Sequence, residues 1–119
     1  MTTPTPTQLT LRKPRRLLEV AFDDGSVFEL GFEYLRVSSP SAEVQGHGGG
    51  DSMPPVLGKE QVGITRIDPV GQYAVRLVFD DGHDSGLYTW KYLYQLGSER
   101  DRRWAAYERR RQAARQAAP

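Results

Sequence analysis

The sequence Phe-Asp-Asp-Gly occurs twice in this chain, at residues 22–25 and 79–82. Each copy follows an apolar run of strand-forming residues, and Asp-Asp-Gly supplies the turn-forming acids and the φ > 0 glycine of a tight hairpin. A second strand pattern follows each copy and ends in Tyr-Leu, at residues 34–35 and 92–93. The repeat predicts two strand–turn–strand–short-helix units joined by a long connection.

The remaining periodicity adds a first edge strand, a strand before the second unit and a final helix. The predicted strands are 8–11, 16–22, 27–30, 62–68, 73–79 and 87–90, and the predicted helices are 32–36, 90–96 and about 99–116. Thr89 is the expected cap of the middle helix and Gly97 its end. Ser98 with Asp101 matches a capping box for the final helix. The fold class is therefore α+β: a mostly antiparallel sheet of two units with short helices on one side, plus a C-terminal helix.

We divide the chain into three parts. Residues 1–7 alternate Thr and Pro, which predicts a disordered tail. Residues 8–97 are the domain, and residues 98–119 are a basic helix that is partly frayed. Inside the domain, residues 38–62 are rich in Ser, Pro and Gly, and a loop of this length is usually functional or mobile.

The chain contains no cysteine, which excludes a disulfide scaffold, a thiolate zinc site, a cysteine-ligated cluster and a cysteine nucleophile. No apolar run approaches the roughly 20 residues of a membrane span. The N-terminus lacks the basic and apolar regions of a secretion signal. We therefore expect a cytoplasmic protein without a membrane partner.

Charge is unevenly distributed along the chain. Residues 1–16 carry four basic side chains and no acid, residues 99–119 carry seven arginines, and the part between is acidic. Basic ends bind nucleic acid or an acidic partner, or fold back on an acidic body. Specific nucleic-acid recognition is not expected, because the chain lacks an aromatic-studded basic stripe and a helix-turn-helix pattern.

Three segments resemble the gamma-butyrobetaine hydroxylase N-terminal-like domain family over roughly residues 8–97. They are Leu-Arg at 35–36 with Ser-Pro-Ser at 39–41, Pro-Val-Gly-Gln-Tyr-Ala at 69–74, and Phe-Asp-Asp-Gly-His-Asp-Ser-Gly-Leu-Tyr at 79–88. Members of this family are small stand-alone bacterial proteins, N-terminal domains of hydroxylases, or domains attached to Mrp-type ATPases of iron–sulfur assembly. Nothing in the chain matches the separate catalytic domain of the hydroxylases. The resemblance implies an accessory module without enzymatic activity and without a cofactor.

The resemblance also implies a remnant of a metal site. The hydroxylase version of the domain holds a structural zinc with three cysteines and one histidine, and these positions fall here on Ser39, Ser41, Val44 and His83. Serine is a poor zinc ligand at neutral pH and valine is none. We therefore expect no metal at these positions.

His83 remains the first candidate for chemistry. One interpretation makes it a metal ligand or general base beside Asp81 and Asp84, joined by His47 in a transition-metal constellation. The other makes it a turn residue whose ring hydrogen-bonds the 38–41 loop and replaces the metal as a clamp. The glycines around His47 do not form a phosphate loop, because the Lys-Ser/Thr pair is missing.

Aromatic residues concentrate in the second unit, and most are expected in the core. Trp90 and Tyr94 are candidates for an interface anchor. Arg36 pairs with an acid of the second turn or offers its guanidinium to an anion. The candidate binding surface comprises Arg36, His47, Asp81, His83, Asp84, Tyr88 and Trp90.

Three functions follow from these residues. The first is a protein-docking module with an unidentified partner, linked to iron–sulfur cluster assembly or to a hydroxylase. The second is a metal or small-ligand site centred on His83. The third is weak nucleic-acid binding through the terminal arginines. The 8–11 edge strand could pair with a second copy of the chain, so both a monomer and a weak dimer are compatible with the sequence.

Overall fold

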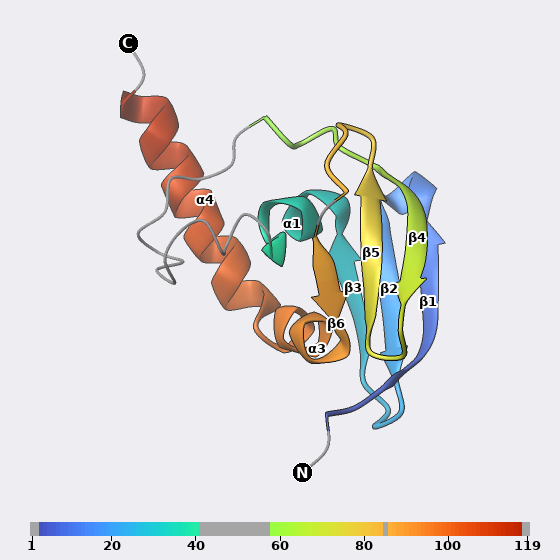
Figure 1. Cartoon of the computed structure of the whole chain (residues 1–119). Coiled ribbons are helices and arrows are strands. Elements are labelled where there is room, and N and C mark those ends of the chain that lie inside the picture. The colour runs from blue at the N-terminus through green and yellow to red at the C-terminus, as the bar shows by residue number, and fades with distance from the viewer. Residues whose placement is uncertain (1–2, 41–57, 85, 118–119) are drawn as a thin grey trace.

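The computed structural model describes residues 3–40, 58–84 and 86–117 (Figure 1). Its elements form two three-stranded antiparallel sheets, in the order β1-β2-β3 and β4-β5-β6, with helices beside them. The α+β prediction is confirmed, with the strands divided between two sheets. The elements are β1 (Pro6–Arg12), a 3-10 turn (Lys13–Arg15), β2 (Leu17–Phe22), β3 (Val27–Gly31), α1 (Phe32–Val37), β4 (Ile64–Val70), β5 (Ala74–Phe79), β6 (Leu87–Thr89), α3 (Trp90–Ser98) and α4 (Arg100–Ala117).

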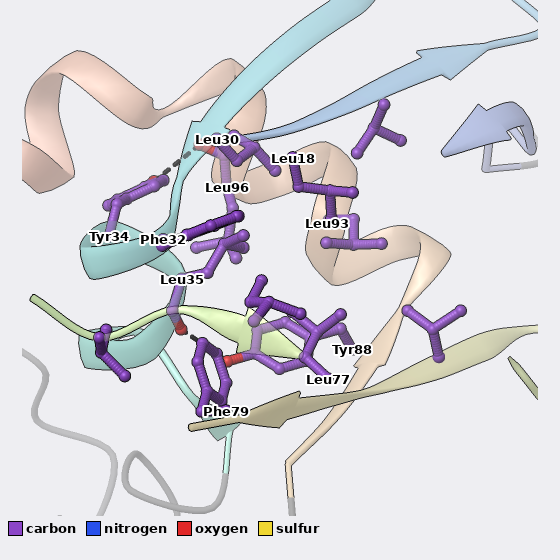
Figure 2. Close-up of a cluster of buried hydrophobic side chains, with 14 of the residues drawn as sticks. Leu18, Leu30, Phe32, Tyr34, Leu35, Leu77, Phe79, Tyr88, Leu93 and Leu96 are labelled. Atoms are coloured by element: carbon purple, nitrogen blue, oxygen red, sulfur yellow. Dashed lines mark hydrogen bonds between the residues drawn. The ribbon is translucent and has the colours of Figure 1, made fainter. Parts of the chain in front are cut away.

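Alternating side chains of the two central strands build one core. The buried positions of β2 are Leu18, Val20 and Phe22, and Leu77 and Phe79 are buried on β5. They belong to a single apolar cluster with residues of α1 and α3 (Figure 2). The period of two along each strand therefore places one face of each sheet in this shared core.

The two Phe-Asp-Asp-Gly turns have the same backbone structure. The Phe22 N–H donates to the Ser26 carbonyl at 2.8 Å, and the Phe79 N–H donates to the His83 carbonyl at 3.0 Å. The glycines of the two turns have φ of 91° and 90°, the left-handed region that glycine adopts without a steric penalty. The internal repeat predicted from the sequence is therefore confirmed in the geometry of both turns.

The short helices of the two units bind each other reciprocally. The Tyr34 hydroxyl of α1 donates to the Leu96 carbonyl near the end of α3 at 2.7 Å (Figure 2). The Tyr92 hydroxyl of α3 donates to the Ser38 carbonyl at the end of α1 at 2.6 Å. Each repeated tyrosine thus satisfies a carbonyl that its partner helix leaves without an intrahelical donor.

The predicted tail at 1–7 extends too far. Strand β1 begins at Pro6, because Thr5 exchanges two hydrogen bonds with Asp23 at the first turn. Proline is tolerated there because β1 is an edge strand.

The predicted boundary between the last two helices is also wrong. Gly97 lies inside α3, where a Cβ atom would overlap the ring of Phe28, so glycine serves close packing at this position. The Ser98 hydroxyl donates to the Gln95 carbonyl and does not cap α4. The predicted cap at Thr89 is confirmed, since its hydroxyl accepts the Tyr92 N–H.

Helix α4 extends to Ala117, and fraying of its last turns stays a prediction. Arg111 binds Glu33 of α1 at 2.6 Å, and Arg115 binds Glu60 at 2.8 Å. These ion pairs hold the C-terminal half of the helix against the body. Within the described part of the chain, α4 and the other helices are too short or too polar to cross a membrane.

Candidate functional site

The end of α1 and the second turn bring together four of the residues singled out in the sequence. Arg36 lies in the last turn of α1, and Ser39 follows two residues after the helix ends. Asp81 and His83 belong to the turn after β5. We call Arg36, Ser39, Asp81 and His83 the turn site.

Ser39 and His83 form a direct side-chain contact. The Ser39 Oγ atom lies 2.7 Å from His83 Nε2, and Ser39 is fully buried. A Cβ atom at Gly86 would lie 2.5 Å from Ser39 Oγ, so only glycine allows this close approach. The contact is the one that the interpretation of His83 as a clamp on the loop after α1 requires.

Asp81 binds one residue that precedes the long connection between the two units and one that follows it. Its Oδ2 atom accepts the Arg36 Nε–H at 3.0 Å and the Lys59 ammonium at 2.7 Å. Partial burial alone would raise the pKa of Asp81, but bonds from Lys59, from the His83 N–H and from Arg36 outweigh it and lower that pKa to about 2. Asp81 is therefore ionised at neutral pH. Arg36 therefore pairs with an acid of the second turn, which is the first of the two roles predicted for it from the sequence.

His83 is poorly placed to act as a base. Burial, and then the charge of Arg36, lower the pKa of its imidazole below the ordinary value. Among the described residues, no carboxylate hydrogen-bonds the ring, because Asp81 accepts the His83 backbone N–H instead. A Ser–His pair with a buried hydroxyl and no orienting acid lacks the arrangement of a nucleophilic triad.

Ser39 and His83, the described positions of the zinc site of the hydroxylase domains, do not have the geometry of two zinc ligands. Two ligand atoms of a tetrahedral zinc lie about 3.4 Å apart, whereas Ser39 Oγ and His83 Nε2 are 2.7 Å apart and hydrogen-bond each other. The described residues contain no group of three acids or histidines that could hold a metal ion. Ser41, Val44 and His47 lie outside the described residues.

The other predicted surface residues do not extend the turn site. Asp84 is exposed, but Tyr88 is fully buried and donates to the Leu35 carbonyl at 2.6 Å (Figure 2). Trp90 lies at the opposite end of β5, where its indole N–H donates to the Gln72 carbonyl at 2.8 Å. The candidate surface is therefore not contiguous, because the strands between its members bury Tyr88 and separate Trp90 from His83.

Tyr94 contacts the first turn. Its ring packs edge-on against Phe22 and Phe28, with centroids 5.0 and 5.4 Å away. Its hydroxyl donates to Asp24 at 2.7 Å, and this bond lowers the pKa of Asp24. Tyr94 follows Tyr-Leu as Arg36 does in the first unit, so each unit contacts the second aspartate of the other unit's turn.

The basic ends of the chain fold back on its acidic body. Arg12 and Arg15 pair with glutamates of sheet β1-β2-β3, at 2.7 and 3.2 Å. On α4, Arg111 and Arg115 pair with Glu33 and Glu60 of the body. Three further arginines pair with Glu99 and Asp101 at the start of the helix: Arg100, Arg102 and Arg103. Intramolecular pairing accounts for most of the charge that had suggested nucleic-acid binding.

An open groove lies away from the turn site, and sequence reasoning missed it. Its volume is about 770 Å³, and it is lined by β3 and by the junction of α3 and α4, which contact each other at Phe28 and Gly97. The apolar side is exposed at Val27, whose exposed fraction is 57%. We call this feature the β3 groove; it is lined by Val27, Phe28, Glu29, Leu30, Gly97, Ser98, Glu99, Arg100, Asp101 and Arg102.

Comparison with known proteins finds one family and several solved structures. The model of the family described as "Gamma-butyrobetaine hydroxylase-like, N-terminal" matches residues 9–94. A crystal structure of a DUF971-family protein of unknown function from Acidithiobacillus ferrooxidans ATCC 23270 is 39% identical, with a TM-score of 0.66 over 80% of this chain and 94% of that one. Two solution NMR structures are 52% and 45% identical, with TM-scores of 0.79 and 0.77; they cover 97% and 95% of this chain and 88% of each of theirs. No curated protein matches the chain.

Proposed function

Because this chain belongs to the family of gamma-butyrobetaine hydroxylase-like N-terminal domains, we propose that it is a non-catalytic docking module that binds a partner protein through the β3 groove. The β3 groove is the observation that carries this proposal. It presents the exposed apolar side chain of Val27 beside charged side chains along the α3–α4 wall. An apolar centre with a polar rim is the usual composition of a protein interface.

The use of the reactive side chains supports the same proposal. The imidazole of His83 binds Ser39, and the carboxylate of Asp81 binds Arg36 and Lys59. These bonds join the end of α1 to the second turn and engage the reactive side chains of the described turn site with one another. The metal-site alternative centred on His83 therefore receives no support from the geometry, and paired arginines weaken the nucleic-acid alternative.

Partners of two kinds are the first to test. The family resemblance implies hydroxylases and the iron–sulfur assembly machinery as proteins with which such domains are associated. A domain of this kind contributes binding and orientation, while any catalysis belongs to its partner.

A pair of matched variants tests the docking proposal. Val27 and Tyr73 have exposed fractions of 57% and 58%, but only Val27 lines the β3 groove. Val27→Glu and Tyr73→Glu therefore introduce the same charge at equally exposed apolar positions. Wild type, each immobilised variant and a blank resin are incubated with native lysate of the source organism, and bound proteins are quantified.

A protein retained by wild type and by Tyr73→Glu, but lost from Val27→Glu, supports docking at the β3 groove. Equal retention by all three proteins, or no specific retention by wild type, overturns the proposal. Circular dichroism of both variants establishes that each remains folded.

A further inference from the structure

Helices α3 and α4 are joined through a single residue, Glu99. Helix α3 ends at Ser98 and α4 begins at Arg100, and Figure 1 shows that the chain changes direction between them. The backbone of Glu99 has φ −106° and ψ 14°, next to the α-helical region. Its N–H donates to the Gln95 carbonyl and its carbonyl accepts the Arg103 N–H, both at 2.9 Å. Both bonds have the four-residue spacing of an α-helix, so helical hydrogen bonding already runs up to the bend from each side.

The side chain of Glu99 also suits a continuous helix. It binds Arg102 at 2.7 Å and Arg103 at 2.9 Å, at the i,i+3 and i,i+4 spacings that meet on one helix face. Glutamate is a good helix former. Rotation of Glu99 into the α-helical region therefore keeps these pairs and fuses α3 and α4 into one helix of residues 90–117, about 42 Å long.

A small and largely polar contact holds α4 against the body. Among the described side chains of α4, only Tyr107 is buried. Its hydroxyl and the guanidinium group of Arg111 bind Glu33 at 2.8 and 2.6 Å. The ring of Trp104 meets Tyr34 of α1 edge-on, with centroids 6.1 Å apart. Elements with few buried apolar contacts open at a low cost in free energy, so α4 separates from α1 more readily than the rest of the domain unfolds.

We propose that α4 exchanges between two copies of this chain. When Glu99 becomes helical in both copies, each α4 leaves its own α1 and docks on α1 of the other copy, which gives a dimer with twofold symmetry. Tyr107 and Arg111 of one chain then bind Glu33 of the other. Because the contacts between α4 and α1 are remade between the copies, exchange costs mainly the entropy of association and increases with protein concentration. This inference goes beyond docking at the β3 groove and does not depend on it.

Two complementary charge reversals test the exchange. Glu33→Arg and Arg111→Glu each place like charges where these two residues meet, so each chain loses the ion pair that holds its own α4. In an equimolar mixture, exchange brings the native Arg111 of one chain to the native Glu33 of the other, and the two introduced charges meet with opposite signs at the second contact. Light scattering and native mass spectrometry measure association. We expect monomers of each variant alone and a heterodimer in the mixture, with hydrogen exchange of residues 104–117 slowed about tenfold.

A matched mixture provides the control. Glu108 pairs with Arg111 inside α4 at 3.2 Å, so Glu108→Arg is the same reversal at a position that exchange does not bring to α1. Glu108→Arg mixed with Arg111→Glu should stay monomeric. Should a reversal at Glu33 or Arg111 fail to fold by circular dichroism, Glu60→Arg with Arg115→Glu repeats the test at the second ion pair, where Arg115 is 62% exposed.

A heterodimer in the complementary mixture, without one in the control, supports exchange of α4. Monomers with fast hydrogen exchange in the complementary mixture overturn it. Dimers in both mixtures also overturn it, because association would then not depend on the contact between Glu33 and Arg111.

The bend at Glu99 is tested by a second comparison in the same mixture. Glu99→Ala and Glu99→Gly, each placed in both chains, remove the same carboxylate but differ in helix propensity. Straightening predicts a dissociation constant higher for Glu99→Gly by about fivefold for each of the two junctions. Equal dissociation constants overturn the straightening of α3 and α4 into one helix.

Discussion

Ser39 Oγ lies 2.7 Å from His83 Nε2, and this bond fastens the loop after α1 to the turn of the second unit. The first unit has Ser26 at the position of His83, and its hydroxyl is 3.5 Å from the Tyr94 hydroxyl. The same turn therefore carries a short, partly buried bond in one unit and a long one in the other.

Loss of this bond is expected to destabilise the domain. His83→Ala leaves the buried Ser39 hydroxyl without its imidazole partner, which costs about 1–3 kcal/mol of the free energy of unfolding. Ser26→Ala at the equivalent position is the control, with an expected cost below about 0.5 kcal/mol. Urea unfolding measures both. Equal costs would contradict the role of His83 as a clamp.

The same residue makes stability depend on pH. The pKa of His83 is lower in the folded chain than the ordinary value of about 6.5, because burial and Arg36 disfavour its charged form. As pH falls below that value, the unfolded chain binds more protons than the folded chain, so the free energy of unfolding decreases. Thermal melts of wild type should fall between about pH 7 and pH 5, whereas His83→Gln should show a smaller fall. Parallel curves would contradict the assignment.

Asp81 should contribute more than its equivalent in the first unit. Asp81→Asn removes the charge that pairs Arg36 and Lys59, and the Arg36 side chain is only 11% exposed. We expect a loss of about 2 kcal/mol at neutral pH. Because the folded pKa of Asp81 is about 2, the wild-type advantage persists above the unfolded value of about 4 and disappears as pH falls toward 2. Chemical unfolding from pH 2 to 7 measures the effect, with Asp24→Asn as the control. If Asp24→Asn lowered the free energy of unfolding as much as Asp81→Asn does, this ranking would be contradicted.

Gly97→Ala should destabilise the chain although it replaces a helical glycine. Replacing glycine by alanine ordinarily stabilises a helix interior by about 1 kcal/mol. Here the new Cβ would overlap Phe28, so we expect a loss of about 1–3 kcal/mol. Gly97→Ala combined with Phe28→Leu should recover part of that loss in a double-mutant cycle. A higher melting temperature for Gly97→Ala alone would contradict the close packing.

The α4 helix should loosen when Glu33 loses its charge. Glu33 accepts the Tyr107 hydroxyl at 2.8 Å and Arg111 at 2.6 Å, and Arg111 is 13% exposed. Burial, followed by the bond to Glu33, raises the pKa of Tyr107. Glu33→Gln should cost about 1–2 kcal/mol and speed hydrogen exchange in residues 108–117. Glu108→Gln is the control, because Glu108 also pairs with Arg111 but is 46% exposed. If hydrogen exchange in Glu33→Gln were unchanged, the role of Glu33 in holding α4 would be contradicted.

The repeat was predictable because its signals are local. Turn residues, the Thr89 cap and strand alternation act over a few positions, and both turns formed as expected. The end of α3 was not predictable from the same rules, because glycine at a helix end and glycine under an aromatic ring look identical in sequence. Counted from the two Tyr-Leu pairs, Phe28 corresponds to Gly86, and Ser39 corresponds to Gly97. In the structure Phe28 packs on Gly97 and Ser39 packs on Gly86, so each glycine makes room for a residue of the other unit.

The candidate site was predictable only in part. The clamp of His83 followed from the resemblance together with the chemistry of serine, and Arg36 was already expected to pair with the turn. The β3 groove was missed because its walls lie far apart in the chain. The sequence did contain one indication of it, the alternation of side chains along β3. This alternation places Val27 on the solvent-facing side of the strand, whereas Phe28 and Leu30 lie on the side that faces the core.

Backbone amide shifts, mapped by NMR with a captured partner, test the central claim most directly. The account predicts that the amide chemical shifts of residues 27–30 and 97–102 change on binding, while those of residues 36–39 and 80–84 do not change. Perturbations confined to the turn site would contradict docking at the β3 groove and would return His83 to the centre of the function.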